Sequence, residues 1–230
     1  MQYEYLVFNI IIMTGPFILG LIKPFYFAHR WASAFKSIIL VGIPFIIWDA
    51  LVTGSHWYFN QKYVMGITIL NLPLEEWLFF LTVPFACLFT WEMVTQRVSN
   101  KTYAKISKIR PWLYLLPVPG FLLFFSGLEY TGLVFIFFTI AVLVDQVMQT
   151  DLILQKRFYI YLAWILGFTL IFNGFLTWRP VVLYGEEFQI GLRIITIPIE
   201  DFGYGISLLF LNTAVFERLE MRKQVQLKTV

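Results

Sequence analysis

The chain has 230 residues, of which 59% are hydrophobic, 20% aromatic and 13% charged. Because a soluble domain carries about 25% charged residues, this composition excludes an ordinary soluble globular protein. The single cysteine, Cys87, excludes an internal disulfide and an all-cysteine metal site. Its apolar neighbours predict a small core residue instead of a reactive thiol.

Apolar segments long enough to cross a bilayer recur along the chain, since a spanning helix needs about 20 mostly apolar residues. Seven segments meet this requirement: 4–22, 34–53, 66–93, 111–128, 130–148, 158–178 and 190–216. Pro111, Pro117 and Pro119 crowd the fourth segment, so a six-span alternative with a re-entrant fourth segment stays open.

Basic residues are distributed unevenly between the two sides that seven spans define. One side receives only Lys62, Arg179 and Arg193, and the other receives the remaining 14 of the 17 Lys and Arg residues. The positive-inside rule predicts a multi-pass protein of the cell (inner) membrane, with its N-terminus outside and its C-terminus cytoplasmic. Glu4 is the only charge ahead of the first apolar run, so we expect a retained first span and not a signal peptide. The basic loops account for the pI of about 8.9, and no nucleic-acid partner is expected.

An internal repeat relates residues 63–92 to residues 188–217 without a gap, at an offset of 125. The matched pairs are Gly66 with Gly191, Pro73 with Pro198, Glu75 with Glu200, Glu76 with Asp201, and Glu92 with Glu217. One residue of gap further upstream, Asp49 falls beside Asn173. An offset of four spans preserves orientation, which predicts parallel repeats.

The predicted fold class is therefore an all-α integral membrane protein of about seven transmembrane helices, with two parallel three-helix repeats joined by a linker helix. Residues 1–110 form the first repeat with spans one to three. Residues 111–129 form the linker span, and residues 130–230 form the second repeat with spans five to seven.

Carboxylates are the candidate catalytic groups, because a carboxylate in hydrocarbon costs about 2.5–3.5 kcal/mol on insertion scales. They are Asp49, Glu75, Glu76, Glu200 and Asp201. The topology places all five toward the outer ends of their helices, in two facing sets. Glu75 and Glu200, which are identical in the two halves, are the strongest candidates. The competing interpretation is an ordinary helix start, in which a proline is followed by acids that the helix dipole favours. Glu92 and Glu217 are expected to be surface charges.

Residues around these acids are the candidate substrate-binding groups. They are Trp48, Trp77, Phe202, Asn173, Pro73 and Pro198. For the three aromatic residues, packing and a role in the site remain equal alternatives. No His–carboxylate spacing predicts a metal site.

The strings Asn71-Leu-Pro-Leu-Glu-Glu-Trp77 and Ile197-Pro-Ile-Glu-Asp-Phe202, each with an upstream Trp-Asp or Phe-Asn pair, resemble the lycopene cyclases of the heterodimeric bacterial type. The likeness is to the fused single-chain form, which is related to the fungal lycopene cyclase domain. It covers nearly the whole chain, with Asn173 departing from the Asp49 of the first half.

The resemblance implies an intramolecular lyase or isomerase of carotenoid biosynthesis, a lycopene β-cyclase that forms γ-carotene and then β-carotene without net redox change. Such a reaction needs a protonated acid, a base and aromatic faces that stabilise a cation. The implied partners are lycopene or a related acyclic carotenoid, the lipid bilayer and other enzymes of the carotenoid pathway. No cofactor is expected, because the sequence has no G-x-G-x-x-G flavin-binding fingerprint.

A small-solute membrane transporter with a 3+1+3 helix repeat is the main alternative, because buried carboxylates also mark ion and proton paths. The depth of the acids discriminates between the two. Transport sites lie near the midplane of the membrane, whereas these acids are predicted toward one end of their helices.

Overall fold

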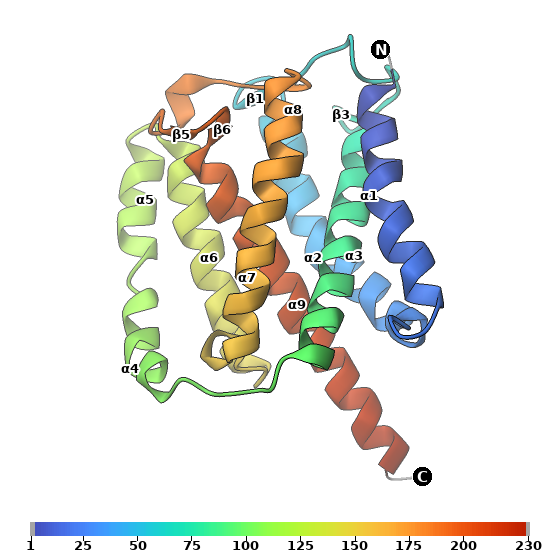
Figure 1. Cartoon of the computed structure of the whole chain (residues 1–230). Helices are drawn as coiled ribbons and strands as arrows, with labels where there is room; N and C mark the ends of the chain where they lie inside the picture. Colours follow the sequence, from blue (N-terminus) through green and yellow to red (C-terminus); the bar gives the residue numbers. More distant parts are fainter. Residues whose placement is uncertain (1–2, 229–230) are drawn as a thin grey trace.

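Most of residues 3–228, which the computed structural model describes, lie in helices that run between two ends of a bundle (Figure 1). The helices are α1 (Glu4–Leu21), α2 (Trp31–Val52), α3 (Leu74–Arg97), α4 (Ala104–Leu113), α5 (Pro117–Phe125), α6 (Glu129–Val147), α7 (Lys156–Phe168), α8 (Gly174–Trp178) and α9 (Ile199–Lys228). A π-helical turn, Thr169–Asn173, joins α7 to α8, so these elements make one continuous passage. The two termini lie at opposite ends of the bundle (Figure 1).

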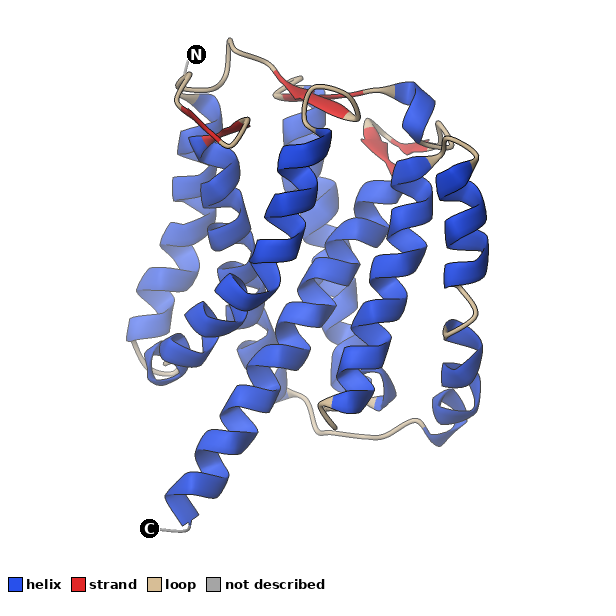
Figure 2. Ribbon diagram, turned by 180° about the vertical axis from the view of Figure 1, so that it is seen from behind, coloured by secondary structure: helices blue, strands red, loops and turns tan. Residues whose placement is uncertain are grey.

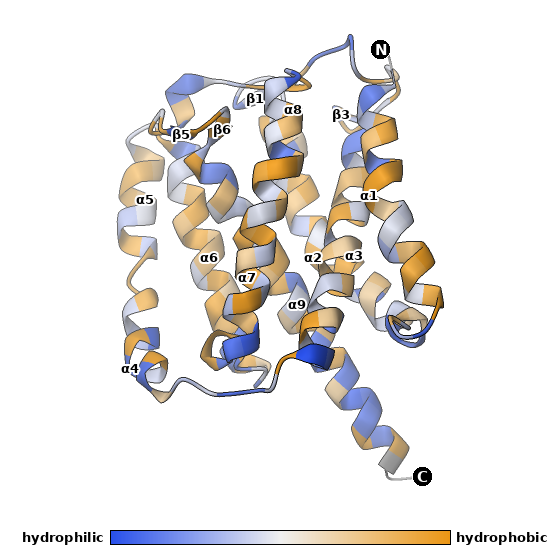
Figure 3. Cartoon of the chain, in the orientation of Figure 1, coloured by the Kyte–Doolittle hydropathy of each residue, from blue (hydrophilic) through white to orange (hydrophobic). Residues whose placement is uncertain are grey.

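Long apolar runs explain the main helices. Within the described residues, five helical segments are long and apolar enough to cross a membrane by length and composition. They are Glu4–Leu21, Ala28–Val52, Leu74–Arg97, Glu129–Val147 and Lys156–Trp178. Figure 3 shows apolar residues along these helices and hydrophilic residues gathered toward the ends of the bundle. The last turns of α9 are hydrophilic and project beyond the other helices.

The predicted fourth span is not a single helix but two short ones. The expected segment 111–128 is replaced by α4, which begins seven residues earlier at Ala104, and by α5, with a turn over Tyr114–Leu116 between them. Pro117 occupies the first position of α5, where its missing N–H costs no helical hydrogen bond. The two short helices follow one another along the height of the bundle (Figure 1).

The strands are short and lie at the end of the bundle that holds the N-terminus (Figure 2). They are β1 (Trp57–Phe59), β2 (Thr68–Ile69), β3 (Leu72–Pro73), β4 (Val182–Tyr184), β5 (Arg193–Ile194) and β6 (Ile197–Pro198). Two of the pairings, β2 with β3 and β5 with β6, are local hairpins. The third joins β1 to β4 in antiparallel register, with Trp57 opposite Tyr184, and so ties the two halves together.

Two predicted helix starts are wrong, because a hairpin precedes each helix. Segments 66–93 and 190–216 were predicted to be helical from their first residues, but α3 begins at Leu74 and α9 at Ile199. Gly66 and Gly191 have φ of +83° and +76°, and the chain reverses at Leu70 and Ile195, which have φ of +49° and +62°. Positive φ values interrupt a right-handed helix. The apolar run before each proline is therefore a turn folded over the helix, not an added helical turn.

The two predicted halves interleave. Helix α2 packs against α9, and α3 packs against α7, so each half supplies neighbours to the other. Phe8 of α1 contacts the rings of Phe172 and Phe175 with centroid distances of 6.0 and 5.9 Å. At the N-terminal end, Arg179 donates two hydrogen bonds to the Glu4 carboxylate at 2.9 and 2.7 Å.

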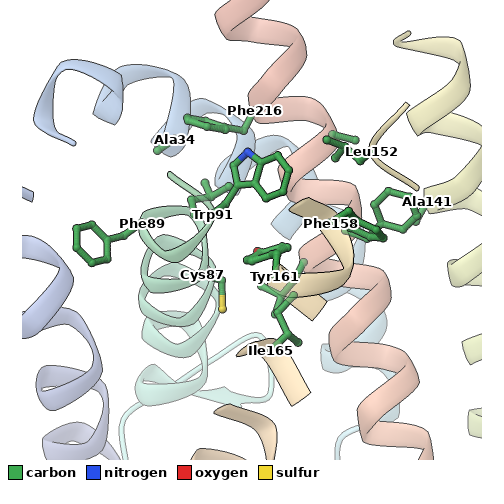
Figure 4. Close-up of a cluster of buried hydrophobic side chains, with 14 of the residues drawn as sticks. Ala34, Cys87, Phe89, Trp91, Ala141, Leu152, Phe158, Tyr161, Ile165 and Phe216 are labelled. Carbon is green, nitrogen blue, oxygen red and sulfur yellow. The ribbon is translucent and has the colours of Figure 1, made fainter. Parts of the chain in front are cut away.

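A large cluster of buried hydrophobic side chains, many of them aromatic, joins the C-terminal half of α3 to the middle of α9 (Figure 4). Trp91, Phe158, Tyr161 and Phe216 are each no more than 2% exposed within it. Cys87 is 3% exposed in the same cluster, which confirms the prediction of a small core residue.

Glu92 and Glu217 are not free surface charges. Glu92 is 4% exposed and accepts a 2.8 Å hydrogen bond from Arg30, and Glu217 accepts one of 2.8 Å from Trp91 Nε1. The expectation of surface charges fails because Arg30, just before α2, lies 2.8 Å from the Glu92 carboxylate and 3.8 Å from that of Glu217.

Candidate active site

Each acidic pair occupies the first turn of a helix that follows a hairpin. Glu75 and Glu76 begin α3 after β3, and Glu200 and Asp201 begin α9 after β6. Pro73 and Pro198 end those strands, and each pairs across its hairpin, with Thr68 and Arg193 respectively. The local structure thus recurs at the offset of 125 residues, as do the acids.

The two acids of each pair point to different surroundings. Glu75 Oε1 accepts a hydrogen bond from the Met65 backbone N–H at 2.7 Å, and Glu200 Oε1 accepts one from the Ile190 N–H at 2.9 Å. Glu200 also accepts from the Thr131 hydroxyl at 2.6 Å. Each of these two carboxyl groups holds the loop that leads into its hairpin. Neither lines the apolar cavity, of about 130 Å³, on which Glu76 and Asp201 lie.

Glu76 and Asp201 face that cavity, and each is bound by a tyrosine. Tyr5 Oη donates to Glu76 Oε2 at 2.5 Å, and Tyr130 Oη donates to Asp201 Oδ1 at 2.6 Å. The two tyrosines lie on α1 and α6 and are themselves 125 residues apart. Tyr5 and Tyr130 are 1% and 4% exposed, so both hydrogen bonds are shielded from solvent.

The partner of each cavity-facing acid differs between the halves. In the first half, the carboxyl groups of Asp49 and Glu76 lie within hydrogen-bonding reach of each other, and Trp57 Nε1 donates to Asp49 Oδ1 at 2.5 Å. In the second half, the amide of Asn173 donates to Asp201 Oδ2 at 2.6 Å. The repeat therefore places a carboxyl in one half where the other half has an amide.

Asp201 has a third donor from outside the helices. Tyr184 of β4 donates its hydroxyl proton to Asp201 Oδ2 at 2.6 Å. Burial, followed by the negative charge of Asp201, raises the pKa of Tyr184 well above its usual value. Tyr184 therefore keeps its proton and remains a donor at neutral pH.

The cavity between these groups has a volume of about 130 Å³ and is predominantly apolar. Three carboxyl groups reach it, from Asp49, Glu76 and Asp201. The aromatic side chains of its wall are Tyr5, Trp57, Phe59, Phe79, Phe80, Tyr130, Phe168, Phe172, Tyr184 and Tyr204. Such a wall surrounds the three acids with apolar and aromatic side chains, as is common in small-molecule sites.

The candidate substrate-binding residues are divided by this geometry. Asn173 lines the cavity, whereas the other five do not. Trp77 Nε1 donates to the Ile69 carbonyl at 3.1 Å and so braces the first hairpin. Trp48 lies beside His56, with a centroid distance of 5.6 Å, and Phe202 is buried at 8% exposure. Pro73 and Pro198 are buried in the hairpins.

Four hydrogen-bond donors of the site were not singled out from the sequence: Tyr5, Trp57, Tyr130 and Tyr184. A signal existed for two of them, since Glu4-Tyr5 and Glu129-Tyr130 repeat at the same offset of 125. Trp57 and Tyr184 have no such signal, because they meet through the long-range pairing of β1 with β4.

His56 is buried beside Trp57, with ring centroids 6.1 Å apart. Its ring is 5% exposed, stacks on Phe188 with centroids 3.9 Å apart, and its Nε2 lies 3.1 Å from the Glu129 carboxylate. Burial lowers the pKa of His56 below its usual value, and this effect outweighs the opposing attraction of Glu129.

Within residues 3–228, no group of three or more His, Cys, Asp and Glu side chains is arranged to hold a metal ion.

Comparison with protein families matches the chain to the lycopene cyclase model over residues 2–94 and again over residues 127–219. The two matched stretches start and end 125 residues apart, which is the offset of the repeat. No curated protein and no solved structure matches the chain. The family match covers most of the sequence and includes both acidic pairs, and the chain therefore belongs to the lycopene cyclase family.

Proposed function

We propose that this protein is a lycopene β-cyclase of the bilayer that closes the acyclic ends of lycopene into β-rings by acid–base chemistry. The family membership supports a carotenoid cyclase role. The observation that carries the finer proposal is the joint placement of Asp49, Glu76 and Asp201 at one aromatic-walled cavity.

The chemistry begins with an alkene, which is a poor base and needs a strong, water-shielded acid. Protonation of the terminal double bond gives a tertiary cation. The neighbouring double bond attacks this cation, which closes the ring and moves the positive charge onto a ring carbon. Loss of an adjacent ring proton then gives the β-ring. One proton enters and one leaves, so the product is an isomer of the substrate and no redox partner is consumed.

The aromatic wall suits the intermediate cation. Phe, Tyr and Trp faces attract a cation by about 0.5–2 kcal/mol each, and more when it is desolvated. Phe79, Phe80 and Tyr204 lie on the same cavity as Glu76 and Asp201. A carboxylate in this setting would also stabilise positive charge in the transition state.

Lycopene is far longer than the cavity, so only one end group enters it at a time. The α7–α8 passage forms part of the cavity wall through Phe168, Thr169 and Phe172. Its outer side carries exposed apolar residues such as Ile171, which is 65% exposed. The polyene would leave the cavity beside the α7–α8 helical segment and extend into the lipid. The enzyme would then release and rebind its substrate to close the second end.

The five long apolar helices support placing the protein in a membrane, where such a substrate dissolves. The transporter alternative gains no support from the family match. The depth of the acids also argues against a transporter, because they lie in the first turns of α3 and α9 and not at mid-helix.

Expression in a bacterium that accumulates lycopene tests the proposal. The pigments should change from lycopene to monocyclic and bicyclic products, as measured by chromatography and absorption spectra. An empty vector and the Glu76→Gln/Asp201→Asn double variant are the controls. Unchanged lycopene, with the wild-type protein shown to be folded in the membrane, would rule out the cyclase activity.

A further inference from the structure

The two halves of the site differ in their capacity to hold a proton. Glu76 and Asp201 occupy equivalent positions, and each accepts a tyrosine hydrogen bond. The difference lies in the next group, which is Asp49 beside Glu76 but Asn173 beside Asp201. If the proposed cyclase function holds, this difference assigns the acid and the base.

In the first half, donors already satisfy one oxygen of each carboxyl group. Trp57 and Thr53 donate to Asp49 Oδ1, and Tyr5 donates to Glu76 Oε2. Asp49 Oδ2 is buried and has no other donor among the described residues, so the Glu76 carboxyl is its available partner. Two carboxyl groups can hydrogen-bond to each other only when one of them is protonated. The pair therefore retains one proton between its members.

In the second half, three hydrogen-bond donors favour the anion and oppose the effect of burial. Asp201 accepts three hydrogen bonds of 2.6 Å, from Tyr130, Asn173 and Tyr184. A carboxylate that receives two or three such bonds is stabilised in its charged form. The Asn173 amide donates to the charge but has no acidic proton to share. Asp201 is thus held as a carboxylate within the same cavity as the protonated pair.

We infer that the Asp49–Glu76 pair is the general acid that protonates the terminal double bond, and that Asp201 is the base that removes the ring proton. In the first step, a carboxyl O–H bond of the pair breaks, a C–H bond forms on the alkene, and the pair becomes fully ionised. After ring closure, a ring C–H bond breaks, its electron pair forms the ring double bond, and the proton passes to Asp201. Each turnover moves one proton from the pair to Asp201, and the site resets when that proton returns.

Deuterium labelling separates the two roles. Purified protein in lipid vesicles is supplied with lycopene in D₂O, and both the product and the recovered lycopene are analysed by mass spectrometry. Glu76→Gln removes the acid, so we expect β-ring formation to fall at least about 100-fold and the recovered lycopene to carry no solvent deuterium. Asp49→Asn breaks the same proton-sharing pair and serves as a second probe if Glu76→Gln folds poorly.

Asp201→Asn should behave differently. The pair can still protonate the alkene and its conjugate base can take a proton back, but the ring proton has no acceptor. We expect ring formation to fall at least about 100-fold while the recovered lycopene gains solvent deuterium. Glu186→Gln is the matched control, since Glu186 is exposed on the same end of the molecule, and it should match the wild type in both measurements.

The outcomes distinguish this inference from the proposed function. If the wild type leaves lycopene unchanged, the cyclase function itself is wrong. If the wild type forms rings but Glu76→Gln and Asp201→Asn give the same labelling, the division into acid and base is wrong. Labelled lycopene from Glu76→Gln with unlabelled lycopene from Asp201→Asn would reverse the assignment.

Discussion

The Asn173 amide donates to the Asp201 carboxylate at 2.6 Å, at the place where the other half sets Asp49 against Glu76. An amide in place of a carboxyl is thus one difference between two sites that share a hairpin, a helix start and a tyrosine. Chemical substitution at these positions is the most direct probe of the site.

Reciprocal exchange at the two positions is expected to be damaging. Asp49→Asn removes the shared proton of the first half, and Asn173→Asp gives Asp201 a carboxyl partner with which it shares a proton. Each single variant should lose at least about 100-fold in turnover, because Asp49→Asn disables the acid and Asn173→Asp leaves the base partly protonated. Turnover is measured per folded protein with lycopene in vesicles. Wild-type rates in both singles would show that this position does not govern proton transfer.

Adjacent acids should respond differently to amide replacement. Glu75→Gln keeps an oxygen that can accept the Met65 N–H but places an NH₂ group in a buried site, where an unsatisfied donor costs about 1–3 kcal/mol. We expect a lower melting temperature with turnover per folded molecule within a few-fold of wild type. Glu200→Gln should behave in the same way, while Glu76→Gln should lose turnover. A large loss of turnover in Glu75→Gln at normal stability would restore this residue as a catalytic candidate.

The two tyrosines provide a test based on charge. Tyr130→Phe removes a donor from a carboxylate, and hydrogen bonds to charged groups contribute about 1.5–3 kcal/mol. Tyr5→Phe removes a donor from a carboxyl pair that shares one proton and spreads its single negative charge over two groups, so a smaller loss is expected. Tyr130→Phe should therefore reduce turnover more than Tyr5→Phe, by roughly tenfold if the difference is about 1.4 kcal/mol. Equal effects would indicate equal charge on the two acids.

His56 predicts a pH dependence of stability. Its pKa is lowered in the folded protein, so the unfolded chain binds a proton more readily at this residue. Stability from the neutral imidazole is present above the unfolded pKa of about 6.5 and is lost as the pH falls below it. The change in melting temperature between pH 7.5 and pH 5.5 should therefore be smaller in His56→Gln than in the wild type. An identical change in both proteins would contradict the role of His56.

Topology can be measured independently of activity. Reporter fusions after Lys108 and at the C-terminus should report the cytoplasm, and fusions near His56 and Glu186 should report the outside. This expectation depends on the unequal distribution of Lys and Arg between the two ends. A C-terminus found outside would refute the predicted orientation.

The sequence predicted the helices and the paired acids because both depend on local patterns. Apolar runs locate α1 to α3 within a few residues at most ends, and the 125-residue offset brings Glu76 and Asp201 into equivalent places. The hairpins before α3 and α9 were missed, because an apolar run such as 66–72 does not reveal whether it forms a hairpin or a helix. The structure distinguishes the two through the positive φ values at Gly66, Leu70, Gly191 and Ile195 and through the strand pairings.

The orientation of each acid could not be read from the chain. Successive residues on a helix point about 100° apart, so one member of each pair must face away from the cavity. Which member does so depends on packing against α1 and α6, and the structure turns Glu75 and Glu200 toward the hairpin loops. Trp57 and Tyr184 escaped notice because strand pairing over more than a hundred residues leaves no local signature.

The pairing of β1 with β4 can form only after most of the chain has been synthesised. Residues 49 and 76 emerge early from the ribosome, but the strand that lies across from Trp57 ends at Tyr184. At about 5–20 residues per second, the interval between residue 76 and residue 184 is on the order of 10 s. During that time the nascent chain lacks Asp201. A translation product that ends before β4 lacks Tyr184 and Asp201 of the cavity, so under the proposed mechanism it should not complete ring closure.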